Sequence, residues 1–146
     1  MKIYIGSDHA GFELKGKLIP FLKGLGYEIE DKGPFEYNKD DDYPDFIKLV
    51  AEAVSKEPES RGLVIGKSGQ GEAMCANRVR GVRAAVFYGG NRELIKLSRE
   101  HNDANILSLA AGFTSESEAL EVVKLWLETP FSADERHIRR IQKLDV

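Results

Sequence analysis

This chain of 146 residues has almost no cysteine, no long apolar run and no excess of positive charge, and each shortage excludes a class of protein. The only cysteine, Cys75, cannot form an internal disulfide or a cysteine-based zinc site, which favours a reducing compartment. No stretch approaches the roughly 20 apolar residues of a membrane span. The net charge of -3 argues against a general nucleic-acid binder. We therefore expect a cytoplasmic protein that binds neither membrane nor nucleic acid.

Short apolar strands alternate with amphipathic helices along the whole chain. The spacing predicts strands at Ile3–Ile5, Tyr27–Ile29, Leu63–Ile65, Val82–Phe87 and Asn105–Leu109. It predicts helices at Phe12–Leu25, Asp45–Lys56 (opened by Pro44), Ala73–Val79, Asn91–His101, Ser115–Glu128 and Ser132–Leu144. This alternation predicts one α/β domain over residues 1–146, a three-layer α/β/α sandwich with a mostly parallel five-stranded sheet.

The segment Gly66–Glu72 is the most informative part of the sequence. It follows a strand and precedes a helix, so its glycines allow a tight turn whose amides face a crevice. Glu72 is a carboxylate at the mouth of this anion-binding turn. Acid–base chemistry on an anionic substrate is one interpretation, and ordinary complementation of the helix dipole is the other.

Polar residues follow three of the predicted strands. They are Asp8–His9, Lys67–Ser68 with Glu72, and the turn Ala110–Gly112. Ligands of parallel α/β sheets bind outside the carboxyl ends of the strands, so these groups are expected to share one crevice.

Familiar nucleotide and metal patterns do not fit. The Lys67–Ser68 pair comes too early after Gly62 for a phosphate loop of the Walker type, and the turn after the first strand lacks the middle glycine of a dinucleotide fingerprint. The histidines at 9, 101 and 137 are scattered and show no i, i+4 pairing, so we expect no metal site.

The sequence resembles the ribose-5-phosphate isomerase B family, which includes the galactose-6-phosphate isomerase subunits. The stretches that carry this resemblance are Gly6–Lys15, Asp40–Phe46, Gly66–Arg78, Arg99–Ala104, Thr129–Ser132 and Arg136–Ile141. The resemblance implies a Rossmann-like fold and aldose–ketose isomerisation without metal or organic cofactor. It also implies a homodimer, or a tetramer built from two such dimers, with active sites between subunits and the helix at 132–144 packed on the partner.

Ribose 5-phosphate is the substrate that the resemblance favours, with ribulose 5-phosphate as product. A six-carbon phosphate such as allose or galactose 6-phosphate is an alternative, and so is a non-catalytic module that binds a sugar phosphate. Family members use as base either a cysteine at the end of strand three or a glutamate a few residues later. Gly66 occupies the cysteine position, so Glu72 would be the base, and the helix N-terminus would favour its ionised form.

The resemblance assigns roles to further residues. Ser68, Gly69 and Gly71 would hold the oxyanion, although Ser68 is also a plausible helix cap. His101 and Asn102 would serve ring opening and sugar contact, although a histidine at a helix end is often a cap. Asp8 would bind sugar hydroxyls, with a helix cap as its alternative role, and His9 would bind the phosphate or a hydroxyl. Tyr43 would pack on the sugar or, alternatively, cover the core. Phosphate in the neighbouring subunit's site would be bound by Arg136, His137 and Arg140, whose alternative is a solvated charged face.

Two positions depart from the family pattern. Gly112 stands where many members carry an arginine that helps to bind phosphate, and Lys67 stands where relatives often have a small residue. We hypothesise that Lys67 supplies the charge that Gly112 lacks.

Overall fold

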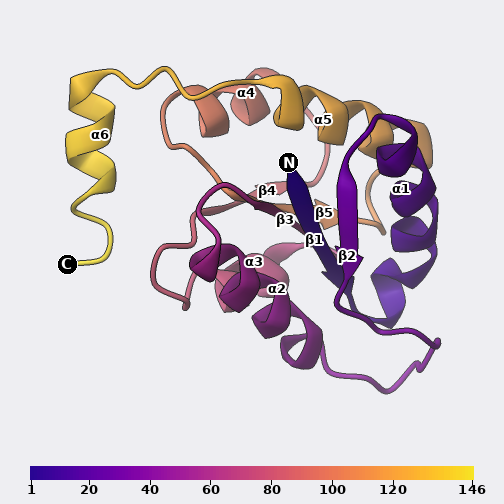
Figure 1. Ribbon diagram of the computed structural model, residues 1–146. Helices are drawn as coiled ribbons and strands as arrows, with labels where there is room; N and C mark the ends of the chain where they lie inside the picture. The colour runs from indigo at the N-terminus through magenta and orange to yellow at the C-terminus, as the bar shows by residue number, and fades with distance from the viewer.

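A parallel sheet of five strands forms the centre of the protein in the computed structural model, which describes Met1–Val146 (Figure 1). The sheet order is β2-β1-β3-β5-β4, and every neighbouring pair is parallel. The strands are β1 (Lys2–Ser7), β2 (Glu28–Asp31), β3 (Arg61–Gly66), β4 (Ala84–Phe87) and β5 (Ile106–Ala110). The predicted α/β sandwich is confirmed, and the sheet is wholly rather than mostly parallel.

Helices cover both faces of this sheet (Figure 1). One face carries α1 (Phe12–Gly24), α4 (Glu93–Glu100) and α5 (Glu116–Glu128), and the other carries α2 (Pro44–Lys56) and α3 (Gln70–Ala76). A short 3-10 turn, η1 (His9–Gly11), links β1 to α1. None of the helices has the length and apolar character needed to cross a membrane.

The alternating side chains of each strand divide the core in two. On β1, Ile3 and Ile5 join the larger cluster with Trp126 of α5, whereas Tyr4 joins the cluster under Val50 of α2. This division follows from the two-residue period of a strand. Burial on both faces explains why the central strands are almost continuously apolar.

The last helix, α6 (Glu135–Ile141), is shorter than the predicted Ser132–Leu144. The residue before Pro130 is extended, Ala133 has a φ of 59°, and the Ser132 amide donates to the Glu100 carbonyl at 3.1 Å. A helix cannot begin while the backbone holds these conformations. As a result α6 stands at the end of an extended connection, apart from the sandwich (Figure 1).

Candidate active site

A left-handed glycine shapes the turn between β3 and α3. Gly69 has a φ of 75° and precedes the first residue of α3, Gln70. The hydroxyl of Ser108, buried on β5, donates to the Gly69 carbonyl at 2.7 Å. The turn is therefore fixed before any ligand arrives. Sequence reasoning missed Ser108, although a lone hydroxyl in the apolar strand Ile106–Ala110 was a usable signal.

Ser68 lies in this turn and is not the cap of α3. Its hydroxyl oxygen accepts the amide hydrogen of Gln70 at 3.3 Å, a local turn contact. Because the oxygen accepts in this contact, the hydroxyl hydrogen can still be donated to another group.

The Glu72 carboxylate is buried directly over the end of β3. The residue is 5% exposed, and a methyl group on Gly66 would overlap its carboxylate. Burial raises the pKa of Glu72, and the nearby charge of Asp8 raises it further. A backbone hydrogen bond lowers the pKa, as expected at a helix N-terminus, but desolvation outweighs it and the net shift is upward. A carboxylate with a raised pKa is a stronger base, as acid–base catalysis requires.

Tyr43 lies over the first turn of α3. A Cβ on Gly71 would come within 2.8 Å of the Tyr43 ring, so only glycine lets the two approach this closely. Tyr43 is partly exposed at the start of α2. Its ring therefore lies over Gly71 and is too exposed to be a cover for the core, the alternative that sequence reasoning left open.

Asp8 caps the turn after β1. Its Oδ1 accepts the amide hydrogens of Ala10 at 2.9 Å and Gly11 at 3.2 Å. Gly11 in turn presses on the end of β3, since a Cβ there would come within 2.5 Å of the Ile65 carbonyl oxygen. The capping role is confirmed, and it brings Asp8 into electrostatic contact with Glu72.

Lys67 and Gly112 are in direct contact. The Gly112 amide donates to the Lys67 carbonyl at 2.9 Å, and a Cβ on Gly112 would come within 2.8 Å of the Lys67 Cγ. Any larger residue at position 112 would displace the stem of Lys67. The two residues that depart from the family pattern, Lys67 and Gly112, are thus neighbours in the structure.

One group of side chains has the composition of a metal site. Asp8, His9 and Asp41 place potential ligand atoms within 4.8 Å of one another. The Asp8 Oδ1 caps η1 and the Asp41 Oδ1 lies 2.7 Å from the His9 Nδ1, whereas the Asp41 Oδ2 has no hydrogen-bond partner. We therefore treat the cluster as a hydrogen-bonded unit.

The second group of predicted site residues lies beside α6. His101, Asn102, His137 and Arg140 line a cavity of about 190 Å³. The two imidazole rings stack with centroids 4.4 Å apart. Burial lowers the pKa of His137, and the positive charges of His101 and Arg136 lower it further. Arg140 gives the cavity a fixed positive charge, which suits an anionic ligand, whereas the lowered pKa of His137 favours its neutral ring.

Arg99 holds the loop that carries His101 and Asn102. This buried side chain donates to the Thr129 carbonyl at 3.0 Å, to the Asp103 Oδ1 at 2.8 Å and to the Ala104 carbonyl at 2.6 Å. Asp103 has a φ of 47°, a conformation that these bonds support. No role for Arg99 emerged from the sequence, because one of its partners, Thr129, lies 30 positions away.

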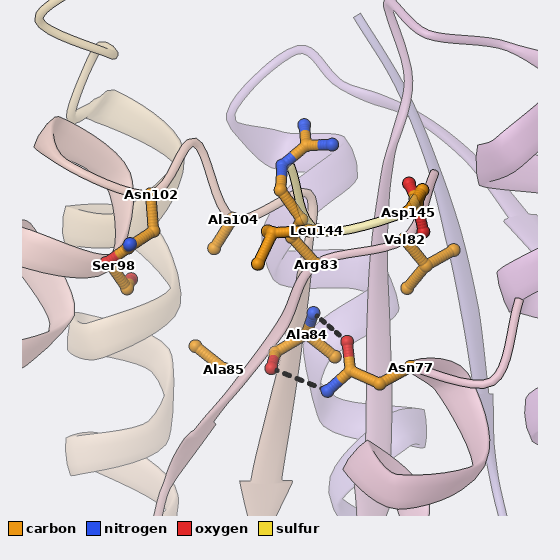
Figure 2. Close-up of a pocket in the computed structure, with 10 residues that line it drawn as sticks. All are labelled: Asn77, Val82, Arg83, Ala84, Ala85, Ser98, Asn102, Ala104, Leu144 and Asp145. Atoms are coloured by element: carbon orange, nitrogen blue, oxygen red, sulfur yellow. Dashed lines mark hydrogen bonds between the residues drawn. The ribbon is translucent and has the colours of Figure 1, made fainter. Parts of the chain in front are cut away.

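A larger cavity, of about 420 Å³, separates the C-terminal residues from β4 (Figure 2). The Asn77 amide exchanges two hydrogen bonds with the Ala84 backbone, at 2.8 and 3.1 Å, and so blocks the free edge of the sheet. Among the predicted site residues only Asn102 reaches this cavity. It borders the second group, and its one carboxylate, Asp145, accepts the Gly81 amide hydrogen at 2.9 Å.

The two groups lie at opposite ends of the parallel strands. Glu72 and its neighbours follow the carboxyl end of β3, whereas His101 and Asn102 precede the amino end of β5, which pairs with β3 in parallel. A strand of six residues is roughly 17 Å long, so the groups do not meet within one chain.

Comparison with known proteins identifies relatives over nearly the full chain. The family model described as Ribose/Galactose Isomerase matches residues 3–144. Ribose-5-phosphate isomerase B of Mycolicibacterium paratuberculosis is 42% identical over 99% of this chain and 89% of its own length. The solved ribose-5-phosphate isomerase B of Clostridium thermocellum is 46% identical, with a TM-score of 0.92 over 99% of this chain and 95% of that one.

A second solved relative comes from Mycoplasma genitalium and contains bound ribulose 5-phosphate. It is 38% identical, with a TM-score of 0.93 over 98% of this chain and 93% of that one. The match of fold, length and sequence over these proteins leads to one conclusion: the chain belongs to the Ribose/Galactose Isomerase family.

Proposed function

We propose that this protein interconverts ribose 5-phosphate and ribulose 5-phosphate. The observation that carries the proposal is the buried Glu72 carboxylate, with its raised pKa, beside an amide-lined turn at the end of β3. The Mycoplasma genitalium relative, which binds ribulose 5-phosphate, supports this choice of substrate. The single half-buried cysteine suits a reducing, cytoplasmic setting.

The reaction requires one proton to move between two neighbouring carbons. Glu72 removes the proton from C2 of the open-chain aldose, and the electron pair forms an enediolate with negative charge on O1. The Ser68 hydroxyl and the amides around Gly69 and Gly71 donate hydrogen bonds to this oxygen. Glu72 then returns the proton to C1, while the hydrogen on O2 passes to O1, and the ketose results. Each catalytic group ends in its starting state.

The remaining predicted contacts divide between the two groups of residues. Asp8, His9 and Tyr43 would contact the sugar, and the Lys67 ammonium would meet its negative charge. In the other group, His101 opens the furanose ring and Asn102 holds a hydroxyl. Arg136, Arg140 and the neighbouring His137 then bind the phosphate, for which arginine forms bidentate hydrogen bonds.

We propose that a second copy of the chain completes each site. His101 and Asn102 are roughly one strand length from Glu72 within the chain, so they would act on a substrate held by the partner. The isolated position of α6 supports the same arrangement, because a helix that buries little of its own surface can pack on a neighbour (Figure 1). On this view residues 1–146 form one domain, and α6 extends onto the partner subunit.

The test is conversion of ribose 5-phosphate in the presence of EDTA. We expect turnover by the wild type and a loss of about 10³-fold for Glu72→Gln, which is within the range that a proton-transfer residue supplies. Glu52→Gln is the matched control, because Glu52 is exposed on α2 and should keep full activity.

Three results would contradict parts of the proposal. Full activity of Glu72→Gln would exclude Glu72 as the base, and loss of activity in EDTA would exclude a metal-free reaction. Wild-type protein that is inactive on ribose 5-phosphate would next be assayed on allose 6-phosphate and galactose 6-phosphate. Binding of these compounds without turnover would favour a non-catalytic module.

A further inference from the structure

Asp41 lies far from His9 in the sequence and holds it through two hydrogen bonds. The His9 backbone amide donates to the Asp41 Oδ1 at 3.0 Å, and the same oxygen lies 2.7 Å from the ring Nδ1. One carboxylate oxygen therefore fixes both the backbone and the imidazole. Asp41 belongs to the segment between β2 and α2, 32 residues from its partner.

The Asp41 carboxylate is nearly enclosed. Its side chain is 7% exposed, and its other oxygen, Oδ2, is buried without a hydrogen-bond partner. A buried carboxylate is costly unless a cation or strong donor compensates it. The His9 ring is the only group in contact that can carry a positive charge. The burial of Asp41 therefore favours the protonated form of His9.

The same segment supports the ring from a second side. Tyr37 packs edge-on against His9 with ring centroids 6.3 Å apart, and it contacts Phe12 in the same way. With Nδ1 bonded to Asp41, the remaining nitrogen is Nε2, at the other end of a ring whose side chain is about one-third exposed. The ring therefore has one engaged nitrogen and one free for a ligand.

The charged groups that face His9 are all acidic. Asp41 has the largest effect and raises the pKa of His9 above its ordinary value of 6.5, and Asp8 and Asp40 act in the same direction. Asp8 comes from the end of β1 and the other two from the segment before α2. The imidazole thus stays cationic at a pH where a free histidine has lost its proton.

We infer that Asp41 is a positioning residue that holds His9 with Nε2–H directed as a charged donor to an oxygen of the substrate. This inference rests on the proposed function and extends it. His9 alone could adopt either tautomer and either ring orientation. The Asp41 bond selects one of each before the substrate binds, as the carboxylate does in other aspartate–histidine pairs.

The first test compares Asp41→Asn with the wild type across pH. Asparagine keeps an oxygen that accepts both His9 bonds but removes the negative charge. We expect KM at pH 8 to rise about tenfold, which corresponds to the loss of one charge-assisted hydrogen bond, with a much smaller change in kcat. The pH above which KM rises should also move down, because the ring loses its proton earlier. Asp42→Asn is the control, since Asp42 is exposed in the same segment, is not among the groups that raise the pKa of His9, and should leave KM nearly unchanged.

A double-mutant cycle distinguishes positioning of the His9 ring by Asp41 from support of the His9 backbone alone. If Asp41 acts through the ring, Asp41→Asn has no further effect on KM in a His9→Gln background. If Asp41 only holds the backbone, the two substitutions add, and the inference is overturned. The inhibition constant of inorganic phosphate identifies the oxygen. If the inhibition constant rises in Asp41→Asn as much as KM does, His9 binds a phosphate oxygen. If the inhibition constant is unchanged, His9 binds a sugar oxygen.

The second test uses wild-type protein and does not depend on turnover. Nitrogen NMR of the imidazoles, with His9 assigned by its absence in His9→Gln, should show a proton on Nδ1 and titration above pH 6.5. A bare Nδ1, or titration at or below 6.5, contradicts the inference even if the isomerase activity is confirmed. The NMR result also stands if Asp41→Asn fails to fold or if ribose 5-phosphate is not the substrate.

Discussion

Glu72 and His101 belong to two groups of residues at opposite ends of the strands of one sheet. The two groups are held in place by different kinds of contact. Glu72 is fixed by backbone: the end of β3 at Gly66, the Gly69 turn and the glycine contacts beside it. His101 depends on side chains, namely its stack with His137 and the bonds that Arg99 makes below it. The first group is therefore rigid within its own chain. The second depends on where α6 lies, and hence on its neighbours.

The largest effect should come from combining the two groups across subunits. Glu72→Gln and His101→Asn are each expected to lose about 10³-fold in activity. In a co-expressed mixture, half of the dimers are mixed, and each mixed dimer holds one site with both native groups. Activity should then return to about a quarter of the wild-type value if the dimer has two-fold symmetry. The measurement is turnover of the mixture beside each parent. A mixture no more active than its parents would contradict shared sites.

A substitution at Gly66 should disable the rigid group without unfolding it. A methyl group there would overlap the Glu72 carboxylate, which is the movable end of a side chain. We expect Gly66→Ala to lose about 10²-fold or more in kcat, since small displacements of a catalytic group have such effects. Its melting temperature should change little. Gly16→Ala is the control, because it enters open space on α1 and should keep activity while raising stability slightly. A Gly66→Ala protein with normal kcat would show that Glu72 does not act from this position.

A smaller effect is expected where Lys67 meets Gly112. Lys67→Ala should raise KM for the phosphosugar about tenfold, as the loss of one charged contact predicts. Gly112→Ala should also raise KM, because the added methyl displaces the Lys67 stem. In a Lys67→Ala background the Gly112 substitution should then add nothing. Lys23→Ala, on the exposed end of α1, is the control. An unchanged KM for Lys67→Ala would refute the hypothesis that Lys67 supplies the charge that Gly112 lacks.

The smallest effects are on stability, and they have opposite signs in the two groups. The pKa of Glu72 is raised, so the folded state binds the proton more tightly, and Glu72 costs stability as the pH rises above 4.5. The pKa of His137 is lowered, so the unfolded state binds the proton more tightly, and His137 costs stability as the pH falls below 6.5. Relative to wild type, Glu72→Gln should therefore melt higher at pH 8, and His137→Asn should gain at pH 5.5. Thermal melts at these two pH values test both signs. A larger gain for Glu72→Gln at pH 5.5 than at pH 8, or for His137→Asn at pH 8 than at pH 5.5, would contradict the assignment.

The sequence was most informative where the determining contacts are local. The strand–turn–helix around Gly66–Glu72 could be predicted because strand, glycines and helix follow one another directly. The helix expected from Ser115 likewise begins there, and the Ser115 hydroxyl oxygen accepts the Glu118 amide hydrogen at 3.1 Å. Patterns of this kind depend on spacing of a few residues, which a single sequence displays.

Contacts between distant segments could not be read in the same way. Ser108 meets Gly69 across 39 positions, and Asp41 meets His9 across 32. The net pKa shift of Glu72 could not be predicted for the same reason, because burial depends on the whole fold whereas the helix dipole is local. The start of α6 was misplaced because Ala133 adopts a positive φ that no residue type announces.

The overlap between position 66 and the Glu72 carboxylate also bears on how the two catalytic types of this family are related. The resemblance implies a thiol base at position 66 in some members and a carboxylate base at position 72 in others. In this fold both would occupy one volume, so they are alternatives. A lineage that gained the cysteine first would crowd the carboxylate, and one that lost the carboxylate first would have no base. The two forms are thus separated by at least two coupled substitutions with an impaired intermediate, which would make exchange between them rare.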